Sequence, residues 1–218
     1  MFPDRLVNGY QAFLQGRFPG ERARYKALGE TGQQPEVMVI GCCDSRVSPE
    51  AIFDAGPGEL FVVRNVANLV PPCEENTQSH HGTSAAIEFA VQALKVKHIV
   101  VLGHASCGGV RAVAEHSVPL SPGDFIGRWM SQVAHVAEGL GEPGPDFTAH
   151  LRRLELAVVE HSLTQLMTFP CVRTLVERGK LTLHGAYFGV ATGLLLIRDP
   201  ETGEFKPCVS DDAIPGDA

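Results

Sequence analysis

Two short motifs contain side chains that commonly bind metal ions. The run CCDSR begins at Cys42, and the run HASCGG begins at His104 and includes Cys107. Two thiolates and one imidazole suit Zn²⁺, and three protein ligands leave the fourth tetrahedral position open, as in catalytic zinc sites. Each motif alone is weak, because a cysteine after a strand is usually a small buried residue. Together, and with Asp44 and Arg46 beside one ligand, they indicate a catalytic zinc centre.

Both motifs directly follow apolar, β-rich runs that we predict to be strands. The predicted strands cover residues 37–41, 60–63, 98–103, 181–187 and 194–198. Loops at the carboxyl ends of parallel strands build the binding crevice of an open α/β sheet, so the first and third strands can bring the motifs together if they are neighbours. The last strand follows too closely for a helical crossover and should pair antiparallel at an edge. The fold class is therefore α/β, with four parallel strands plus an antiparallel edge strand in a mostly parallel central sheet.

Amphipathic patterns between the strands predict helices that flank this sheet. The predicted helices cover residues 83–94, 124–138, 151–167 and 170–177. Residues 3–28 are also helical in pattern but precede the first strand, so we expect an N-terminal helical arm (residues 1–28) outside the sheet. We expect a single domain over residues 1–218, in which the acidic residues 210–218 form a loose tail.

Composition and charge favour a globular protein without nucleic acid or membrane partners. Apolar residues make up 44% of the chain and charged residues 20%, which predicts a sizeable core. The formal net charge of −7 argues against nucleic acid or an anionic membrane as the main partner. No apolar run is long enough to span a membrane, and the N-terminus lacks a secretory pattern, so we expect a cytoplasmic protein. In a reducing compartment the six cysteines are better interpreted as metal ligands or buried thiols than as disulfides.

Three motifs between residues 42 and 109 resemble those of the β-carbonic anhydrase family. The family patterns Cys-x-Asp-Ser-Arg, Arg-Asn-x-Ala-Asn and Gly-His-x-x-Cys-Gly-Gly read here as CCDSR from Cys42, RNVAN from Arg64 and GHASCGG from Gly103. The resemblance implies a carbonate dehydratase, which hydrates CO₂ reversibly to bicarbonate and a proton. It also implies one Zn²⁺ per chain, on which hydroxide is the attacking group.

The resemblance selects the metal ligands from the candidate residues. In the family the first ligand stands two residues before the Asp, which selects Cys42 rather than the adjacent Cys43. His104 and Cys107 complete the set. Alternation along an extended segment would direct Cys43 away from the metal.

The family's acid–base pair next to the first ligand corresponds to Asp44 and Arg46. Asp44 should accept the hydrogen bond of the zinc-bound hydroxide, and Arg46 should keep that carboxylate ionised and away from the metal. The alternative is an ordinary surface salt bridge. In some family members the Asp moves onto the zinc at low pH, and those members typically have a Trp three residues before the first ligand. Here that residue is Val39, so we expect the constitutively open subtype, although Arg64 of the associated bicarbonate pocket is present.

The resemblance also assigns three residues to substrate binding. Phe61 and Val66 would line the CO₂ site, and Gln33 would offer its amide to bicarbonate in a neighbouring subunit; each could equally be core or loop filler. Two positions depart from the family. His80 stands where plant relatives place a Tyr near the substrate, and Gly189 replaces an Asp in the run before the last strand.

The arm carries an apolar stripe that must be buried somewhere. Leu6, Tyr10, Phe13 and Leu14 recur at helical spacing. The arm could pack on its own sheet. It ends close to Gln33, however, and this favours a crossing onto a partner, so we expect a homodimer or a dimer-based higher oligomer.

Three other functions are compatible with parts of this pattern. A hydrolase of COS or CS₂ would use the same fold, the same ligands and the same attacking hydroxide. A zinc-binding scaffold without activity would have no need of the Asp44–Arg46 pair. A thiol redox protein is disfavoured because the chain has no Cys-x-x-Cys motif.

Overall fold

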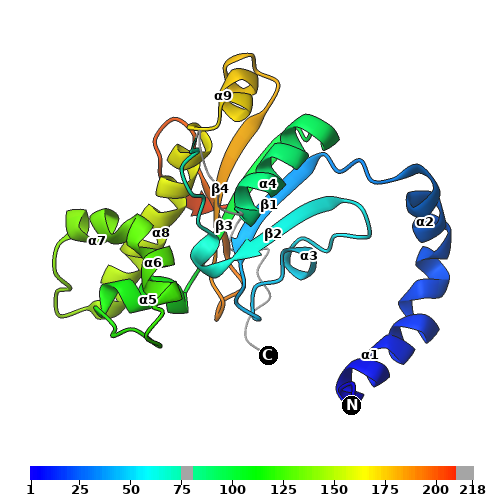
Figure 1. Ribbon diagram of the computed structural model, residues 1–218, viewed down its shortest axis with the longest axis horizontal. Coiled ribbons are helices and arrows are strands. Elements are labelled where there is room, and N and C mark those ends of the chain that lie inside the picture. The colour runs from blue at the N-terminus through cyan, green and yellow to red at the C-terminus, as the bar shows by residue number, and fades with distance from the viewer. Residues whose placement is uncertain (75–80, 210–218) are drawn as a thin grey trace.

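A computed structural model describes residues 1–74 and 81–209, and it contains one six-stranded sheet in the order β2-β1-β3-β4-β5-β6 (Figure 1). The strands are β1 Val37–Cys42, β2 Leu60–Asn65, β3 His98–His104, β4 Thr182–Phe188, β5 Leu195–Arg198 and β6 Phe205–Pro207. Strands β1 to β4 are parallel, whereas β5 and β6 pair antiparallel at one edge. The predicted α/β class and the antiparallel edge are thus confirmed, and β6 is an additional strand that the sequence pattern did not indicate.

The predicted helices are present with two internal changes, and short helices at Pro49–Ile52 and Gly108–Ala114 are additional. The α-helices are α1 Asp4–Gln15, α2 Arg17–Thr31, α3 Pro49–Ile52, α4 Gly82–Glu88, α5 Gly108–Ala114, α6 Phe125–Met130, α7 Ala134–Leu140, α8 Phe147–Leu166 and α9 Pro170–Glu177. The helix predicted over 83–94 is α-helical only in its first half, α4, and continues as the π-helical segment η2, Phe89–Leu94. The helix predicted over 124–138 is interrupted by the 3₁₀ segment η3, Ser131–Val133. A second 3₁₀ segment, η1, covers Val66–Asn68.

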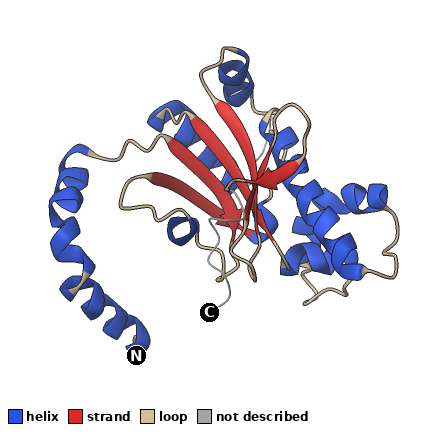
Figure 2. Ribbon diagram, turned by 180° about the vertical axis from the view of Figure 1, so that it is seen from behind, coloured by secondary structure: helices blue, strands red, loops and turns tan. Residues whose placement is uncertain are grey.

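The two faces of the sheet are covered very differently. On one face, alternate residues of β1 and β3 such as Met38 and Ile99 form a core with α4, α8 and α9. On the other face, the cluster around Val39 and Leu102 receives only one helical side chain from the described residues, Ile52 of α3. Figure 2 views the sheet from this second side, with α3 in front of the strands. Much of this apolar sheet face therefore has no helix over it from residues 1–74 and 81–209.

The expected N-terminal arm is present as two helices, α1 and α2, which meet at Gly16 and extend away from the sheet (Figure 1). Neither helix contains a buried residue. The arm is attached to the body through Arg24, which pairs with Glu59 at 3.0 Å and donates to the Pro57 carbonyl at 2.6 Å. None of the helices in the described part of the chain has the length and apolar composition that a membrane span requires.

Candidate metal centre

The ends of β1 and β3 bring the two metal-binding motifs together. The two strands are parallel neighbours in register, so Cys42 at the end of β1 lies beside His104 at the end of β3. The ligand atoms of Cys42, His104 and Cys107 all lie within 4.8 Å of one another, and all three residues are buried. The two Sγ atoms are 4.0 Å apart. Two thiolates bound to one tetrahedral zinc are separated by about 3.8 Å, so the group has the spacing that this ion needs.

His104 has the hydrogen-bonding arrangement of a metal ligand. Its Nδ1 lies 2.9 Å from the carbonyl of Ala105 and is therefore the protonated nitrogen. Its Nε2 is buried and has no hydrogen-bond partner in the described part of the chain. A buried polar atom without a partner costs about 1–3 kcal/mol, which a bond to a metal ion would remove. The donor set and the free nitrogen therefore both fit Zn²⁺.

The two thiols are held in different ways. Cys42 Sγ accepts the backbone N–H of Asp44 at 3.4 Å, whereas Cys107 is the N-cap residue directly before α5. The hydrogen bond from the Cys107 thiol lowers the pKa of Cys42, against the opposing effect of burial. The same contact, together with burial, raises the pKa of Cys107, so Cys42 is the more acidic of the two thiols.

Asp44 and Arg46 form a bidentate ion pair next to the first ligand. Arg46 Nε lies 2.9 Å from Asp44 Oδ1, and Nη2 lies 2.7 Å from Oδ2. This guanidinium holds the pKa of Asp44 well below its usual range. Arg46 Nη2 also donates to the Ser106 carbonyl at 3.1 Å. Because Ser106 precedes Cys107, Arg46 links the loops that carry the two cysteine ligands.

Arg64, which the family resemblance associates with a bicarbonate pocket, holds the backbone of the first metal loop. Its Nε donates to the Cys42 carbonyl at 2.8 Å and its Nη2 to the Asp44 carbonyl at 2.6 Å. The next residue, Asn65, is also structural. It exchanges hydrogen bonds of 2.8 Å with the backbone of Leu69 and so fixes η1, where Ala67 has a left-handed φ of 64°.

The three predicted substrate residues are dispersed in one chain. Val66 packs in the same apolar cluster as both cysteine ligands, and a Cβ on Gly109 would approach its Cγ1 to 2.7 Å. Phe61 is paired with Met38, near the start of β1, and packs against the other core cluster, with its ring 5.9 Å from that of the exposed Phe89. Gln33 precedes β1, whose six residues extend about 20 Å. Phe61 and Gln33 therefore lie toward the end of the sheet opposite to the metal group of their own chain.

Two further expectations concern Gly189 and Cys43, which are not metal ligands. The turn at Gly189 closes without the family's Asp, because its N–H donates to Leu194 at 2.8 Å and its carbonyl accepts from Gly193 at 2.8 Å. A Cβ on Gly189 would lie 2.4 Å from Thr192 Oγ1, so glycine suits this turn. Cys43 is exposed, as expected for a residue that is not a ligand. His80 and the tail at 210–218 lie outside the described residues.

The sheet and the Cys–His–Cys group define an α/β protein with a three-ligand metal centre at the carboxyl ends of parallel strands. A family model described as carbonic anhydrase matches residues 37–195. A mitochondrial β-carbonic anhydrase 6 of Arabidopsis thaliana is 34% identical over 87% of this chain and 65% of its own length. The chain belongs to the β-carbonic anhydrase family.

Solved structures agree with this assignment. The β-carbonic anhydrase CcaA superposes with a TM-score of 0.85 and 28% identity, covering 95% of this chain and 92% of that one. A carbonic anhydrase pair from Sordaria macrospora, described as tetrameric, gives a TM-score of 0.76 and 29% identity, covering 93% of this chain and 98% of that one. The chain spans slightly less than two thirds of the Arabidopsis relative.

Proposed function

We propose that this protein is a carbonate dehydratase that hydrates CO₂ reversibly, with one Zn²⁺ per chain held by Cys42, His104 and Cys107. The observation that carries the proposal is the buried Cys–His–Cys group with the Asp44–Arg46 ion pair directly beside it. A purely structural zinc site does not require such a pair. The names of the family's members support the same reaction.

Zinc held by Cys42, His104 and Cys107 would supply a bound water acidic enough to act as a nucleophile near neutral pH. The protein's own part is to orient that group and to admit CO₂. Asp44 is anionic and can only accept hydrogen bonds, so it orients a hydroxyl group next to the ligands. Arg46 occupies both of its oxygens from the far side and holds the carboxylate in place.

The position of Asp44 supports the constitutively open subtype as part of this proposal. Both of its carboxylate oxygens accept hydrogen bonds from Arg46, and so neither is free to approach the ligands without breaking the pair. Val39, which replaces the family's Trp, is 1% exposed and packs in the cluster of the second sheet face. A buried valine leaves no indole to bind bicarbonate there.

The substrate site is completed by a second copy of the chain in this proposal. Val66 lines the CO₂ site from the same chain, where it contacts the metal loop at Gly109. Phe61 and Gln33 face away from their own metal group and serve the partner's site. Hydrophobic lining suits CO₂, which is apolar, while the amide of Gln33 suits bicarbonate.

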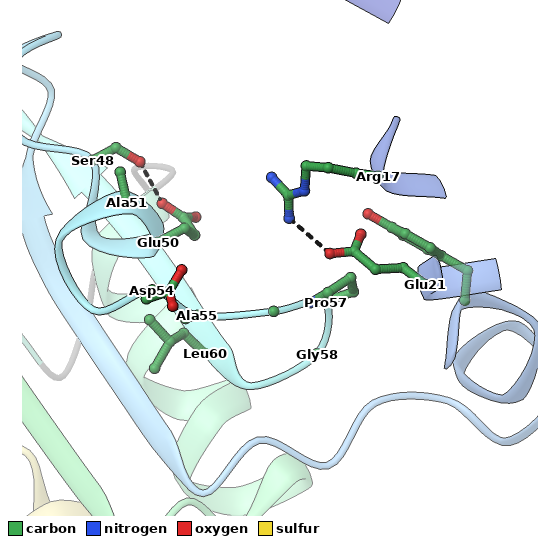
Figure 3. Close-up of a pocket in the computed structure, with 12 residues that line it drawn as sticks. Arg17, Glu21, Ser48, Glu50, Ala51, Asp54, Ala55, Pro57, Gly58 and Leu60 are labelled. Carbon is green, nitrogen blue, oxygen red and sulfur yellow. Dashed lines mark hydrogen bonds and ion pairs between the residues drawn. The ribbon is translucent and has the colours of Figure 1, made fainter. Parts of the chain in front are cut away.

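Three features of the single chain support a homodimer. The arm exposes Leu6 by 55% and Tyr10 by 61%. A pocket of about 650 Å³, lined by Arg17, Glu21 and Asp54 among others, lies between the start of α2 and the region of α3 (Figure 3). The second sheet face receives only Ile52 from the helices of the described residues, and β2 is an edge strand rich in apolar residues. A partner's arm would cover that face, and the tetramers described from Sordaria extend the same idea to larger assemblies.

A stopped-flow CO₂ hydration assay on protein with quantified zinc tests the proposed function. We expect one zinc per chain and a hydration rate that depends on it. A parallel assay with CS₂ should show little turnover, since no observation favours the sulfur substrates. Cytoplasmic localisation, expected from the N-terminal composition, stays a prediction, because the Arabidopsis relative is named as a mitochondrial protein. Cell fractionation would test this prediction.

A further inference from the structure

A buried carboxylate, Glu155, lies directly behind the metal loop and has no part in the proposed reaction. It belongs to α8 and is only 3% exposed. Its Oε1 accepts the backbone N–H of Cys107 at 2.9 Å, and its Oε2 accepts the hydroxyl of Tyr187 at 2.7 Å. Three separate elements, α8, the metal loop and β4, therefore meet at one side chain.

Burying this carboxylate is costly, and the fold provides the partners that it needs. Burial raises the pKa of Glu155, while the hydrogen bonds from Tyr187 and from the Cys107 amide oppose the shift. An aliphatic side chain here would leave the Cys107 N–H and the Tyr187 hydroxyl without this partner. The function of the carboxylate should therefore follow from the group that it binds, which is the backbone amide of the metal ligand Cys107.

The metal loop has a conformation that needs support from outside. Ser106 has a φ of 58°, in the left-handed region that residues with a Cβ seldom adopt. Cys107 then returns to an extended conformation as the N-cap of α5. Helix α8 lies very close to β3 at this level, since a Cβ on Gly103 would approach Val159 Cγ2 to 2.6 Å. Glu155 therefore stands on a rigid element at a fixed distance from the loop.

We propose that Glu155, itself fixed by Tyr187, is the positioning residue of Cys107. By holding the Cys107 amide, the carboxylate keeps the left-handed turn at Ser106 closed and directs the Cys107 sulfur toward Cys42 and His104. The inference rests on the proposed zinc site, but it concerns how the ligand is oriented and not how CO₂ reacts. We therefore expect a change at Glu155 to reduce zinc affinity more than it reduces folding stability.

The test measures zinc affinity by competition with a chelator, and the sulfur-to-metal absorption band after substitution with Co²⁺. Glu155→Leu should weaken zinc binding by about 10- to 100-fold, as expected for a group that orients a metal ligand, and should alter the cobalt band. Glu155→Gln should keep the wild-type affinity, because its amide oxygen accepts from Cys107 while its NH₂ donates to the rotated Tyr187 hydroxyl. Tyr187→Phe should give a loss smaller than that of Glu155→Leu.

Leu166→Ala is the matched control, since it truncates a fully buried residue of the same helix in the other core cluster. It should lower the Tm and leave zinc affinity unchanged. Wild-type zinc affinity in Glu155→Leu, or a loss in Glu155→Gln as large as in Glu155→Leu, would overturn the inference. If Glu155→Leu fails to fold, an unchanged affinity and cobalt band in Tyr187→Phe would overturn it. Wild-type protein that binds zinc without hydrating CO₂ would overturn the proposed function instead.

Discussion

Arg46 and Asp44 are joined by two parallel hydrogen bonds of 2.9 and 2.7 Å, and the same guanidinium reaches the Ser106 carbonyl on the opposite metal loop. The carboxylate is thereby held in one orientation by a residue that also ties the two ligand loops together. Because the Asp44 side chain is only 19% exposed, it is positioned more firmly than a carboxylate in an ordinary surface pair.

Replacing Asp44 by Asn should separate metal binding from catalysis. The variant should retain zinc and lose activity by about 10- to 100-fold, because an amide NH₂ can present a donor where an acceptor is needed. Stopped-flow hydration and metal analysis on the same sample measure both quantities. Asp199→Asn, in the turn between β5 and β6, is the matched control and should keep the full rate. Wild-type activity in Asp44→Asn would leave Asp44 a salt-bridge partner only.

The pH dependence should be simple. Arg46 depresses the pKa of Asp44, so this carboxylate stays ionised at every pH above its ordinary value of about 4. The stabilisation from the pair is complete above that pH and is lost only as the pH falls below it. Between pH 6 and pH 9 the hydration rate should therefore rise through one ionisation, that of the metal-bound water. A steep, cooperative fall, or an acidic crystal form with Asp44 bonded to zinc, would contradict the open subtype.

Complementation between subunits can locate Gln33. Gln33→Ala homodimers should be slow because both sites lack the amide, and His104→Ala homodimers should be inactive because both lack zinc. A heterodimer that carries one variant in each subunit should contain one complete site and be faster than either parent. Co-expression with two different affinity tags isolates this species. If the heterodimer were no faster than the Gln33→Ala homodimer, Gln33 would not act across the interface.

Deleting residues 1–28 tests the role of the arm. None of the three core clusters contains an arm residue, so the body should fold without it. We expect a monomer that binds zinc and has little activity, as measured by light scattering, metal analysis and hydration rate. Deletion of residues 1–3, which precede α1, is the control. A truncated protein that remained dimeric and fully active would exclude an arm-dependent assembly.

The sequence was sufficient for the elements that build the metal site. Strands β1 and β3 are mostly apolar runs rich in valine and isoleucine, and such runs with helical segments between them indicate a parallel sheet. The motifs that follow them had to meet once those strands were neighbours. Helix α9 begins at Pro170, as predicted, since proline is well suited to a first helical turn.

Other features depend on contacts between distant parts of the chain. Strand β6 is only three residues long and exists through its pairing with β5, which no local pattern encodes. Glu155 was missed although it had a detectable signal. It occupies the same buried stripe as Leu151, Leu154, Val158 and Val159, where an acidic residue among apolar ones indicates a satisfied internal carboxylate.

The adjacent cysteines Cys42 and Cys43 provide the most direct test of the metal centre. Cys42 is buried beside His104 and Cys107, whereas Cys43 is exposed, so the two variants differ by one position in the chain. The measurement is zinc content per chain together with CO₂ hydration rate, for Cys42→Ser and Cys43→Ser. We predict that Cys42→Ser loses both, because three ligands leave none to spare, and that Cys43→Ser keeps both. Full zinc and full rate in Cys42→Ser would contradict the assigned site.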